Sequence, residues 1–402
     1  MKRVFIAGAC RTPIGKMGGA LSSLSAVDLG SLVICESLKR SNIPADQVDH
    51  VYMGCVIQAG LGQNVARQAA IKAGLPVNTT AQTVNIVCGS GLDAVNSAAR
   101  LIKSGEADIA VAGGMESMSQ APYALKNARF GYRMGSPMID TPLVDTMVND
   151  ALWDAINDYH MGCTAENIVE RWGITRREMD EFAVDSQNKA TAAVANGSFK
   201  DEIVPVVLKG RKGETVVDAD EGPRPGTTVE ALSRLKPAFK QDGTVTAGNS
   251  SGINDGAAAV ILISEDKVKE LGLVPQAEWI GGALGGVDPA IMGIGPVEST
   301  RKLFKNLGIT MDDIDLVEGN EAFAAQSIAV KRELNIPDEK LNVNGGAIAL
   351  GHPVGASGCR ILVTLIYAMR QKNTTTGLAM LCIGGGMGCS TVIKNYSEVD
   401  KR

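Results

Sequence analysis

The feature that most limits the possible folds is a repeat whose two copies lie toward the two ends of the chain. Five residues of the first copy match five of the second at a constant offset of 266 positions, as between residues 43 and 309. The matched pairs are Ile43 and Ile309, Asp46 and Asp312, Val48 and Ile314, Asp49 and Asp315, and Val51 and Val317. Such self-similarity indicates an internal duplication, and therefore two similar halves.

Each half has the pattern of an α/β unit. An apolar run at 4–7 and another at 51–53 predict strands, and apolar spacing over 26–40 predicts a helix between them. Strands that alternate with helices are typical of a layered domain with a largely parallel sheet. We expect an N-terminal half at 1–118, an inserted loop domain at 119–245, a return to the first half at 246–270, and a C-terminal half at 271–402.

The stretch around Cys88 is a candidate nucleophile site. An apolar run from Val84 predicts a strand that turns at Cys88 and two glycines, and helical spacing then continues until Ser104 and Gly105. The positive end of that helix would favour the thiolate, and its N–H groups could face an oxyanion. The alternative is a small buried cysteine on a tight turn, and on this stretch alone it is the better interpretation.

Four stretches of the C-terminal half are polar or glycine-rich where strands should end. They contain Asn320, Asn344, His352 and Cys382. Ligands of open α/β sheets bind at such strand ends. Each stretch also has a structural alternative, such as a helix cap for Asn320 or simple packing for Cys382. If the duplication is real, pseudo-symmetry brings His352 and Cys382 toward Cys88.

Composition excludes several classes of function. The 402 residues carry 39 basic and 44 acidic side chains, so a net charge of −5 does not favour nucleic acid or an anionic membrane surface. No apolar run approaches the length of a spanning helix, and the first residues lead directly into a strand, so we expect a cytoplasmic protein. Eight cysteines without a CxxC pair and only three histidines argue against structural zinc or a disulfide scaffold.

Two thiols and one imidazole in a single pocket would restrict the chemistry. Acylation of Cys88 needs a base, which His352 could supply. Hydrolysis would need only water and has no use for Cys382. A second thiol is useful when a C–H group must lose a proton or a leaving thiolate must gain one, and both are steps of carbon–carbon bond formation between thioesters.

The motifs together resemble the signature blocks of the thiolase family over essentially the whole chain. They are Cys88-Gly-Ser-Gly-Leu92, Asn320-Glu-Ala-Phe-Ala-Ala-Gln326, Asn342 through Pro353 with Gly355-Ala-Ser-Gly358, and Cys382-Ile-Gly-Gly-Gly-Met387. The resemblance implies a duplicated α/β/α/β/α layered fold, an inserted loop domain that holds coenzyme A, and a tight dimer that commonly pairs into a tetramer.

The resemblance also implies a Claisen condensation of two acetyl-CoA to acetoacetyl-CoA, with coenzyme A thioesters as substrates and no cofactor or metal. Cys88 would take the acetyl group and His352 its proton. Cys382 would remove the α-proton of the second acetyl-CoA, while Asn320 and His352 hold the enolate oxygen. The N–H groups of Cys88 and Gly384 would hold the tetrahedral oxyanion.

One segment resembles the pocket of short-chain, biosynthetic thiolases, in which a methionine fills the space of a longer acyl tail. It contains His160 and Met161. Further positions match residues that contact coenzyme A in the family, namely Leu152, Arg224, Phe239, Ala247, Ser251, Met292 and Phe323. Asp93 stands where many members of the family carry a basic residue, and Ala231 replaces a serine that is frequent there. The resemblance therefore does not determine the affinity for the nucleotide of coenzyme A.

Three other functions remain to be compared with this one. A thiolase that cleaves longer 3-ketoacyl-CoA is the nearest, and His160 with Met161 argues against it. A decarboxylating ketoacyl synthase would normally carry histidine or asparagine in place of Cys382. A non-catalytic acyl carrier would have no use for three reactive side chains. The Met- and Arg-rich segment 119–142 is a candidate subunit contact.

Overall fold

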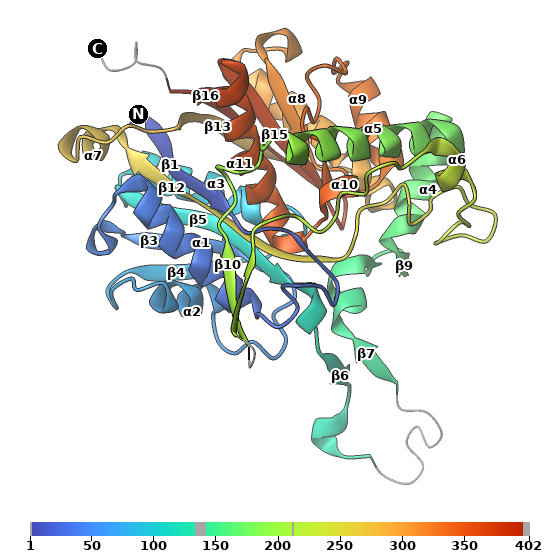
Figure 1. The fold of residues 1–402 in the computed structure, drawn as a ribbon, viewed down its shortest axis with the longest axis horizontal. Helices are drawn as coiled ribbons and strands as arrows, with labels where there is room; N and C mark the ends of the chain where they lie inside the picture. The colour runs from blue at the N-terminus through green and yellow to red at the C-terminus, as the bar shows by residue number, and fades with distance from the viewer. Residues whose placement is uncertain (1, 133–141, 211–212, 397–402) are drawn as a thin grey trace.

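Ten strands join the two halves of the chain into one sheet (Figure 1). The computed structural model describes residues 2–132, 142–210 and 213–396. β2 (Gly15–Lys16) pairs with one central strand. The other nine run in the order β14 (Leu316–Gly319), β15 (Thr376–Ile383), β16 (Met387–Asn395), β13 (Ala277–Gly286), β1 (Val4–Arg11), β12 (Asn254–Ser264), β5 (Ile109–Ser117), β3 (His50–Gly54) and β4 (Thr80–Val84).

Helices form three layers around these strands. The inner layer consists of α3 (Ser90–Ser104) and α11 (Val354–Lys372), which contact each other and strands of both halves. Leu92 and Ile366 lie here in one core with Ile6 and Leu381 from the strands. The outer layers are α1 (Ala26–Ser41) and α2 (Val65–Lys72) on the first half, and α8 (Gly295–Leu307) and α9 (Ala324–Glu333) on the second. This arrangement confirms the α/β/α/β/α layered fold.

The duplication is visible in a matched pair of aspartates. Oδ2 of Asp49, just before β3, accepts hydrogen bonds from the N–H groups of Asp108 and Ile109 at 2.8 and 3.0 Å. Oδ2 of Asp315, just before β14, accepts two from the N–H groups of Thr375 and Thr376, both at 2.9 Å. Each aspartate thus fixes the start of the neighbouring strand in the same way, and the two lie at the repeat offset seen in the sequence.

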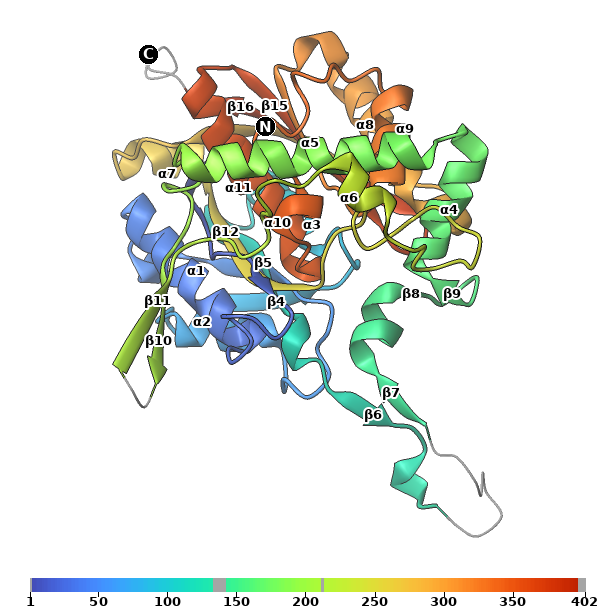
Figure 2. The same cartoon turned by 45° about the vertical axis from the view of Figure 1, so that its right-hand side comes forward.

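The described residues of the inserted segment 119–245 carry two long helices and three two-stranded antiparallel sheets. α4 (Met161–Trp172) and α5 (Arg176–Ala195) lie over the second half, while β6 (Tyr123–Leu125) and β7 (Leu143–Asp145) form an arm that projects from the body (Figure 2). Thr175 and Glu178 form the capping box that the sequence predicted for α5. The remaining elements are β8 (Trp153–Asp154), β9 (Tyr159–His160), β10 (Val206–Gly210), β11 (Gly213–Val217), α6 (Val229–Ser233), α7 (Glu265–Glu270) and α10 (Ala347–Leu350).

One predicted strand begins later than expected. The apolar run 203–208 enters β10 only at Val206. Pro205 lacks an N–H group for a ladder, and Ile203 instead makes an isolated bridge with Arg11 of β1.

Over the described residues, no helix is both long and apolar enough to cross a membrane.

Candidate active site

Cys88 lies on a tight turn between β4 and α3. The strand ends at Val84, three residues before the end of the apolar run, because Val87 adopts a left-handed conformation with φ of 52°. Ser90 fixes the turn: its Oγ accepts from the N–H of Ile86 at 3.0 Å and donates to the carbonyl of Val87 at 2.6 Å. The turn places the sulfur at the entrance of the inner-layer helix.

Two backbone N–H groups face the sulfur of Cys88, its own and that of Gly384, and both favour the thiolate. Enclosure by the protein outweighs them and raises the pKa of Cys88 to about 11. The expected preference for the thiolate is therefore wrong for the free chain, and the resting group is a thiol that needs a base. The same two N–H groups are the pair that the resemblance to thiolases assigned to an oxyanion.

His352 is held by three contacts from different elements. Its N–H donates to Oδ1 of Asn254 at 2.9 Å, its Nδ1 lies 2.5 Å from Oγ of Ser357, and its Nε2 lies 3.5 Å from Nδ2 of Asn320. Gly351 precedes it with φ of 118°, and a side chain there would collide with Asn254. Burial, assisted by the charge of Arg360, lowers the pKa of His352 to about 4, so the imidazole is neutral.

Asn320 and Cys382 reach the same region from neighbouring strand ends. Asn320 follows β14, and its N–H donates to the carbonyl of Met380 in β15 at 2.9 Å. Cys382 is fully buried near the end of β15. Burial, with the nearby sulfur of Cys88, raises the pKa of Cys382, which is therefore also a thiol at rest. Cys88 packs against a buried cluster that contains Val354, two residues beyond His352, so the turns that carry Cys88 and His352 share one cluster.

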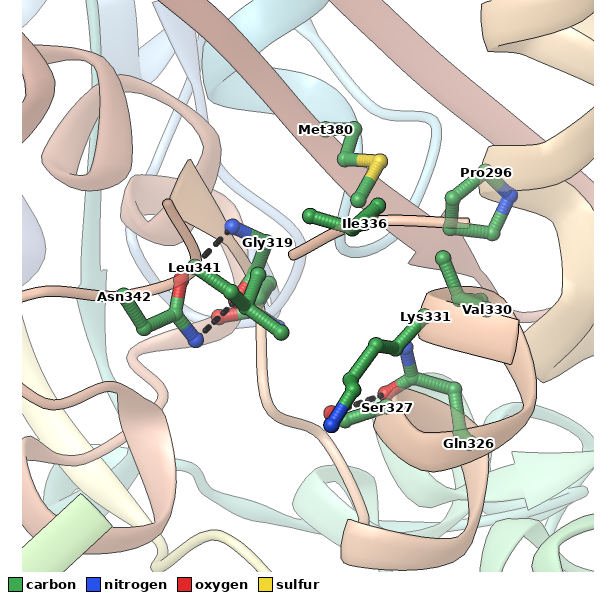
Figure 3. Close-up of a pocket in the computed structure, with 11 residues that line it drawn as sticks. Pro296, Gly319, Gln326, Ser327, Val330, Lys331, Ile336, Leu341, Asn342 and Met380 are labelled. Atoms are coloured by element: carbon green, nitrogen blue, oxygen red, sulfur yellow. Dashed lines mark hydrogen bonds between the residues drawn. The ribbon is translucent and has the colours of Figure 1, made fainter. Parts of the chain in front are cut away.

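A second asparagine fixes the turn that carries Asn320. Oδ1 of Asn342 accepts from the N–H of Gly319 at 2.8 Å, and its Nδ2 donates to the carbonyl of Gly319 at 2.9 Å (Figure 3). A cavity of about 10 Å³ next to these residues is large enough for one water molecule. Met380 and Leu341 close it.

Glu116, which the sequence analysis did not select, ties the two halves together at the site. It is fully buried at the end of β5 and accepts from the N–H groups of Val56, Ile57 and Gly355 at 3.0, 3.1 and 2.8 Å. Gly355 lies in the first turn of α11, so this carboxylate connects the first half to the helix that follows His352. An added Cβ at Gly355 would lie 2.7 Å from Glu116. The sequence offered no signal for this contact because the partners are 239 residues apart.

The residues of the predicted acyl pocket lie beside Cys88 and Gly384. Sδ of Met161 lies 3.3 Å from the position that a Cβ of Gly384 would take. The ring of His160 stacks on Phe239 with 4.7 Å between centroids, and Phe239 meets Phe323 edge-on at 6.0 Å. Nδ1 of His160 accepts from the N–H of Gly162 at 3.0 Å. Met292 belongs to the same buried cluster as Met161, and Leu152 packs on the side of Cys88.

A cleft of about 340 Å³ leads from the surface to the residue before His352. Exposed Arg224 and Ala247 lie on it, and Gly351 forms its inner end. Ser251 is adjacent, with its N–H bonded to the carbonyl of Ala322 at 3.0 Å. Lys16 adds a second basic group to the lining. The cleft thus combines a basic outer end with an inner end at Gly351, the residue before His352.

The two departures from the family pattern lie at different places. Asp93 in the first turn of α3 pairs with Arg100 at 3.5 Å and does not line the cleft. Ala231 is exposed on α6, where its N–H donates to the capping Thr228 at 3.2 Å. Leu232, one residue further, lines the cleft.

Comparison with known proteins gives a consistent family. The model of the thiolase N-terminal domain matches residues 4–266, and that of the thiolase C-terminal domain matches residues 273–395. The chain belongs to the thiolase family. This membership confirms the resemblance seen in the sequence motifs.

Similar proteins cover the full length. An acetyl-CoA acetyltransferase of Syntrophomonas wolfei is 57% identical over 98% of this chain and 99% of its own. Among solved structures, a Bacillus anthracis acetyl-CoA acetyltransferase superposes with a TM-score of 0.95 at 46% identity, covering 98% of this chain and 99% of that one. Human mitochondrial 3-ketoacyl-CoA thiolase superposes at 0.94 with 43% identity and the same coverage.

Proposed function

We propose that this protein is an acetyl-CoA C-acetyltransferase, which condenses two acetyl-CoA to acetoacetyl-CoA and CoA, reversibly, through an acetyl-cysteine intermediate. Acetyltransferases among its full-length relatives support the activity. The single observation that supports the mechanism most is the arrangement of Cys88, His352, Asn320 and Cys382 around one site.

In the first half-reaction the sulfur of Cys88 attacks the carbonyl carbon of acetyl-CoA. Neutral His352 accepts the thiol proton, which the raised pKa of Cys88 makes necessary. The N–H groups of Cys88 and Gly384 hold the tetrahedral oxyanion. When it collapses, the thiolate of CoA leaves and takes the proton of Cys382, so that Cys382 becomes the base for the second step.

In the second half-reaction the thiolate of Cys382 removes a proton from the methyl carbon of a second acetyl-CoA. Protonated His352 and the amide of Asn320 hold the enolate oxygen. The carbanion attacks the acetyl group on Cys88, and a new carbon–carbon bond forms. Cys88 leaves as a thiolate and recovers its proton from His352, which restores both thiols and the neutral imidazole. Exchange at one sulfur implies ping-pong kinetics.

Substrate binding is assigned to the inserted loop domain and the cleft. Arg224 and Ala247 contact the coenzyme at the outer end, and Ser251, Phe239 and Phe323 surround its inner arm. Leu152, His160, Met161 and Met292 enclose the acyl group. The substrates are coenzyme A thioesters, and the steps above require no metal or further cofactor. The enzyme acts in the cytoplasm.

Acyl chain length distinguishes this function from cleavage of longer 3-ketoacyl-CoA. A human mitochondrial 3-ketoacyl-CoA thiolase is among the similar solved structures. Met161, which is buried beside Gly384, supports the short-chain assignment. Thiolysis rates on acetoacetyl-CoA and on a C8 3-ketoacyl-CoA would be compared. We expect a large preference for acetoacetyl-CoA that narrows in Met161→Ala. Equal or better activity on the C8 substrate would overturn the assignment.

We also propose a homotetramer, with the projecting arm as the subunit contact. Tyr123 and Leu143 on this arm are 63% and 62% exposed, although both are large apolar residues. Of the predicted contact at 119–142, residues 133–141 lie outside the described residues. Light scattering of wild type and of Leu143→Asp tests the contact: a tetramer should become a dimer, and an unchanged mass would contradict the assignment.

A further inference from the structure

An enclosed ion pair lies behind the site, between Arg360 on α11 and Glu318 on β14. Each side chain is 2% exposed, and Nη1 of Arg360 is 3.8 Å from Oε2 of Glu318. That separation exceeds a hydrogen bond. Within the described part of the chain, all three guanidinium nitrogens and both carboxylate oxygens are without a hydrogen-bond partner. Buried charges with such poor contacts cost stability, so stabilisation of the fold is a weak explanation for this pair.

A second buried arginine, Arg11, shows what a structural pair looks like in this fold. Nε of Arg11 donates to Glu202 at 2.5 Å, and its Nη1 and Nη2 donate to Asp220 at 2.7 and 2.9 Å. Two carboxylates therefore compensate the charge of Arg11. Arg360 has one carboxylate at a longer distance, and burial raises the pKa of that carboxyl, Glu318, to about 8. The charge of Arg360 is thus compensated less directly than that of Arg11, although the buried carboxyl groups of Glu202 and Glu321 also act on it electrostatically.

Both members of the pair are next to residues that hold the reactive groups. Glu318 is two residues before Asn320 in the same extended segment, so their side chains leave it on one side. Arg360 is three residues beyond Ser357, one turn along α11, and Ser357 bonds Nδ1 of His352. The positive charge of Arg360 disfavours an imidazolium at His352. The pair therefore stands behind the proposed base and the proposed enolate ligand.

We propose that Arg360 is a positioning residue of the transfer reaction: its buried, weakly compensated positive charge keeps the imidazole of His352 unprotonated and ready to accept the thiol proton of Cys88. The proposal rests on the proposed role of His352 as the base. Among the described groups around His352, Arg360 supplies the positive charge. The others are the amides of Asn320 and Asn254, the hydroxyl of Ser357, the thiols of Cys88 and Cys382, and the carboxylate of Glu116, bonded to Gly355 on the same helix.

The pH dependence of Cys88 acetylation in single-turnover experiments tests this. Arg360→Gln removes the charge but keeps a side chain of roughly similar shape. We expect the acid limb of its pH–rate profile to move up by roughly one pH unit. Glu318→Gln removes the opposite charge, so the acid limb of the pH–rate profile of this variant should stay in place or move to lower pH. Arg360→Lys keeps the charge and should keep the wild-type limb. Arg370→Gln is the matched control, since it removes one positive charge from the exposed end of the same helix.

The outcomes separate this proposal from its premise. An acid limb that stays in place in Arg360→Gln, with a reduced amplitude, would indicate a structural role and overturn the proposal. If Arg360→Gln does not fold, Glu318→Gln decides, because an upward shift would contradict the assigned sign. The role of His352 itself is tested by His352→Gln: unaltered acetylation of Cys88 in that variant would remove the premise, whatever Arg360 does.

Discussion

Nδ1 of His352 lies 2.5 Å from Oγ of Ser357, and that hydroxyl donates its proton to the carbonyl of Pro353 at 2.9 Å. A hydroxyl has one proton, so its oxygen accepts from the N–H at Nδ1 of His352. This leaves the lone pair on Nε2, the nitrogen that faces Asn320 at 3.5 Å. One serine thus selects the tautomer that can act as a base.

Ser357→Ala should therefore lower kcat by roughly 10- to 100-fold, with little change in KM, because the imidazole loses its fixed tautomer. Ser299→Ala is a suitable control, since Ser299 is also a buried serine whose hydroxyl is 2.7 Å from another hydroxyl, that of Ser390. Steady-state kinetics of both variants should show the loss only for Ser357. An equal loss in both would indicate a general effect of buried serines.

The two thiols should separate the two half-reactions. Cys88→Ala should abolish acetyl transfer while CoA still binds. Cys382→Ala should still acquire an acetyl group on Cys88 but form no acetoacetyl-CoA, because the base for the second step is gone. Cys389→Ala, at another fully buried cysteine in the adjacent strand β16, should keep turnover. Condensation by Cys382→Ala at the wild-type rate would disprove its assignment.

The acid side of the pH profile follows from His352. Its pKa is depressed from 6.5 to about 4, so the imidazole stays neutral, and able to accept a proton, as the pH falls through 6 and 5. The rate of Cys88 acetylation should not decline with a midpoint near 6.5. Stopped-flow or quench measurements between pH 5 and 7, with circular dichroism to verify folding, would check this. A midpoint near 6.5 would show a solvated imidazole instead.

Position 351, just before His352, tolerates only glycine. Gly351→Ala would face a positive φ of 118° and place its Cβ 2.4 Å from Asn254. Strain of this kind costs about 1–3 kcal/mol, and the displaced Asn254 would release His352, so both stability and kcat should fall. Gly18→Ala has a φ of 67° but open space around it. It should lower Tm modestly and leave kcat unchanged.

Glu116→Gln tests the link between the halves. The amide would direct N–H groups toward backbone N–H donors at Val56 and Gly355, so we expect a loss of about 1–3 kcal/mol in the free energy of unfolding. The start of α11 should also shift, which would lower kcat. Glu106→Gln at an exposed position provides the control. Denaturant unfolding of both variants would show whether the difference exists, and equal stabilities would refute the link.

Much of the fold could be predicted because its signals are local or periodic. The capping box at Thr175 and Glu178 located the start of α5, and the glycine at 105 located the end of α3. The constant offset between Asp49 and Asp315 predicted the two halves, and each aspartate makes the same contacts in its own half. Once the two halves are recognised, their topology predicts that the four loops that carry the motifs lie close together.

The remainder depends on contacts that have no local signature. Val84 ends its strand because Val87 turns, although both are β-branched residues in one apolar run. Ser357 and Asn254 contact His352 through the folded arrangement, and neither was assigned a role from sequence. The helix end near Cys88 suggested a thiolate, but the degree of enclosure, which decides its pKa, is known only from the assembled layers.

The central claim is tested most directly by mass spectrometry of the protein after brief exposure to acetyl-CoA. The account predicts one acetyl group on the peptide that contains Cys88, released when a second portion of acetyl-CoA or free CoA is added, and absent from Cys88→Ala. Acetylation at a different residue, or full turnover by an enzyme that never carries the group on Cys88, would contradict it.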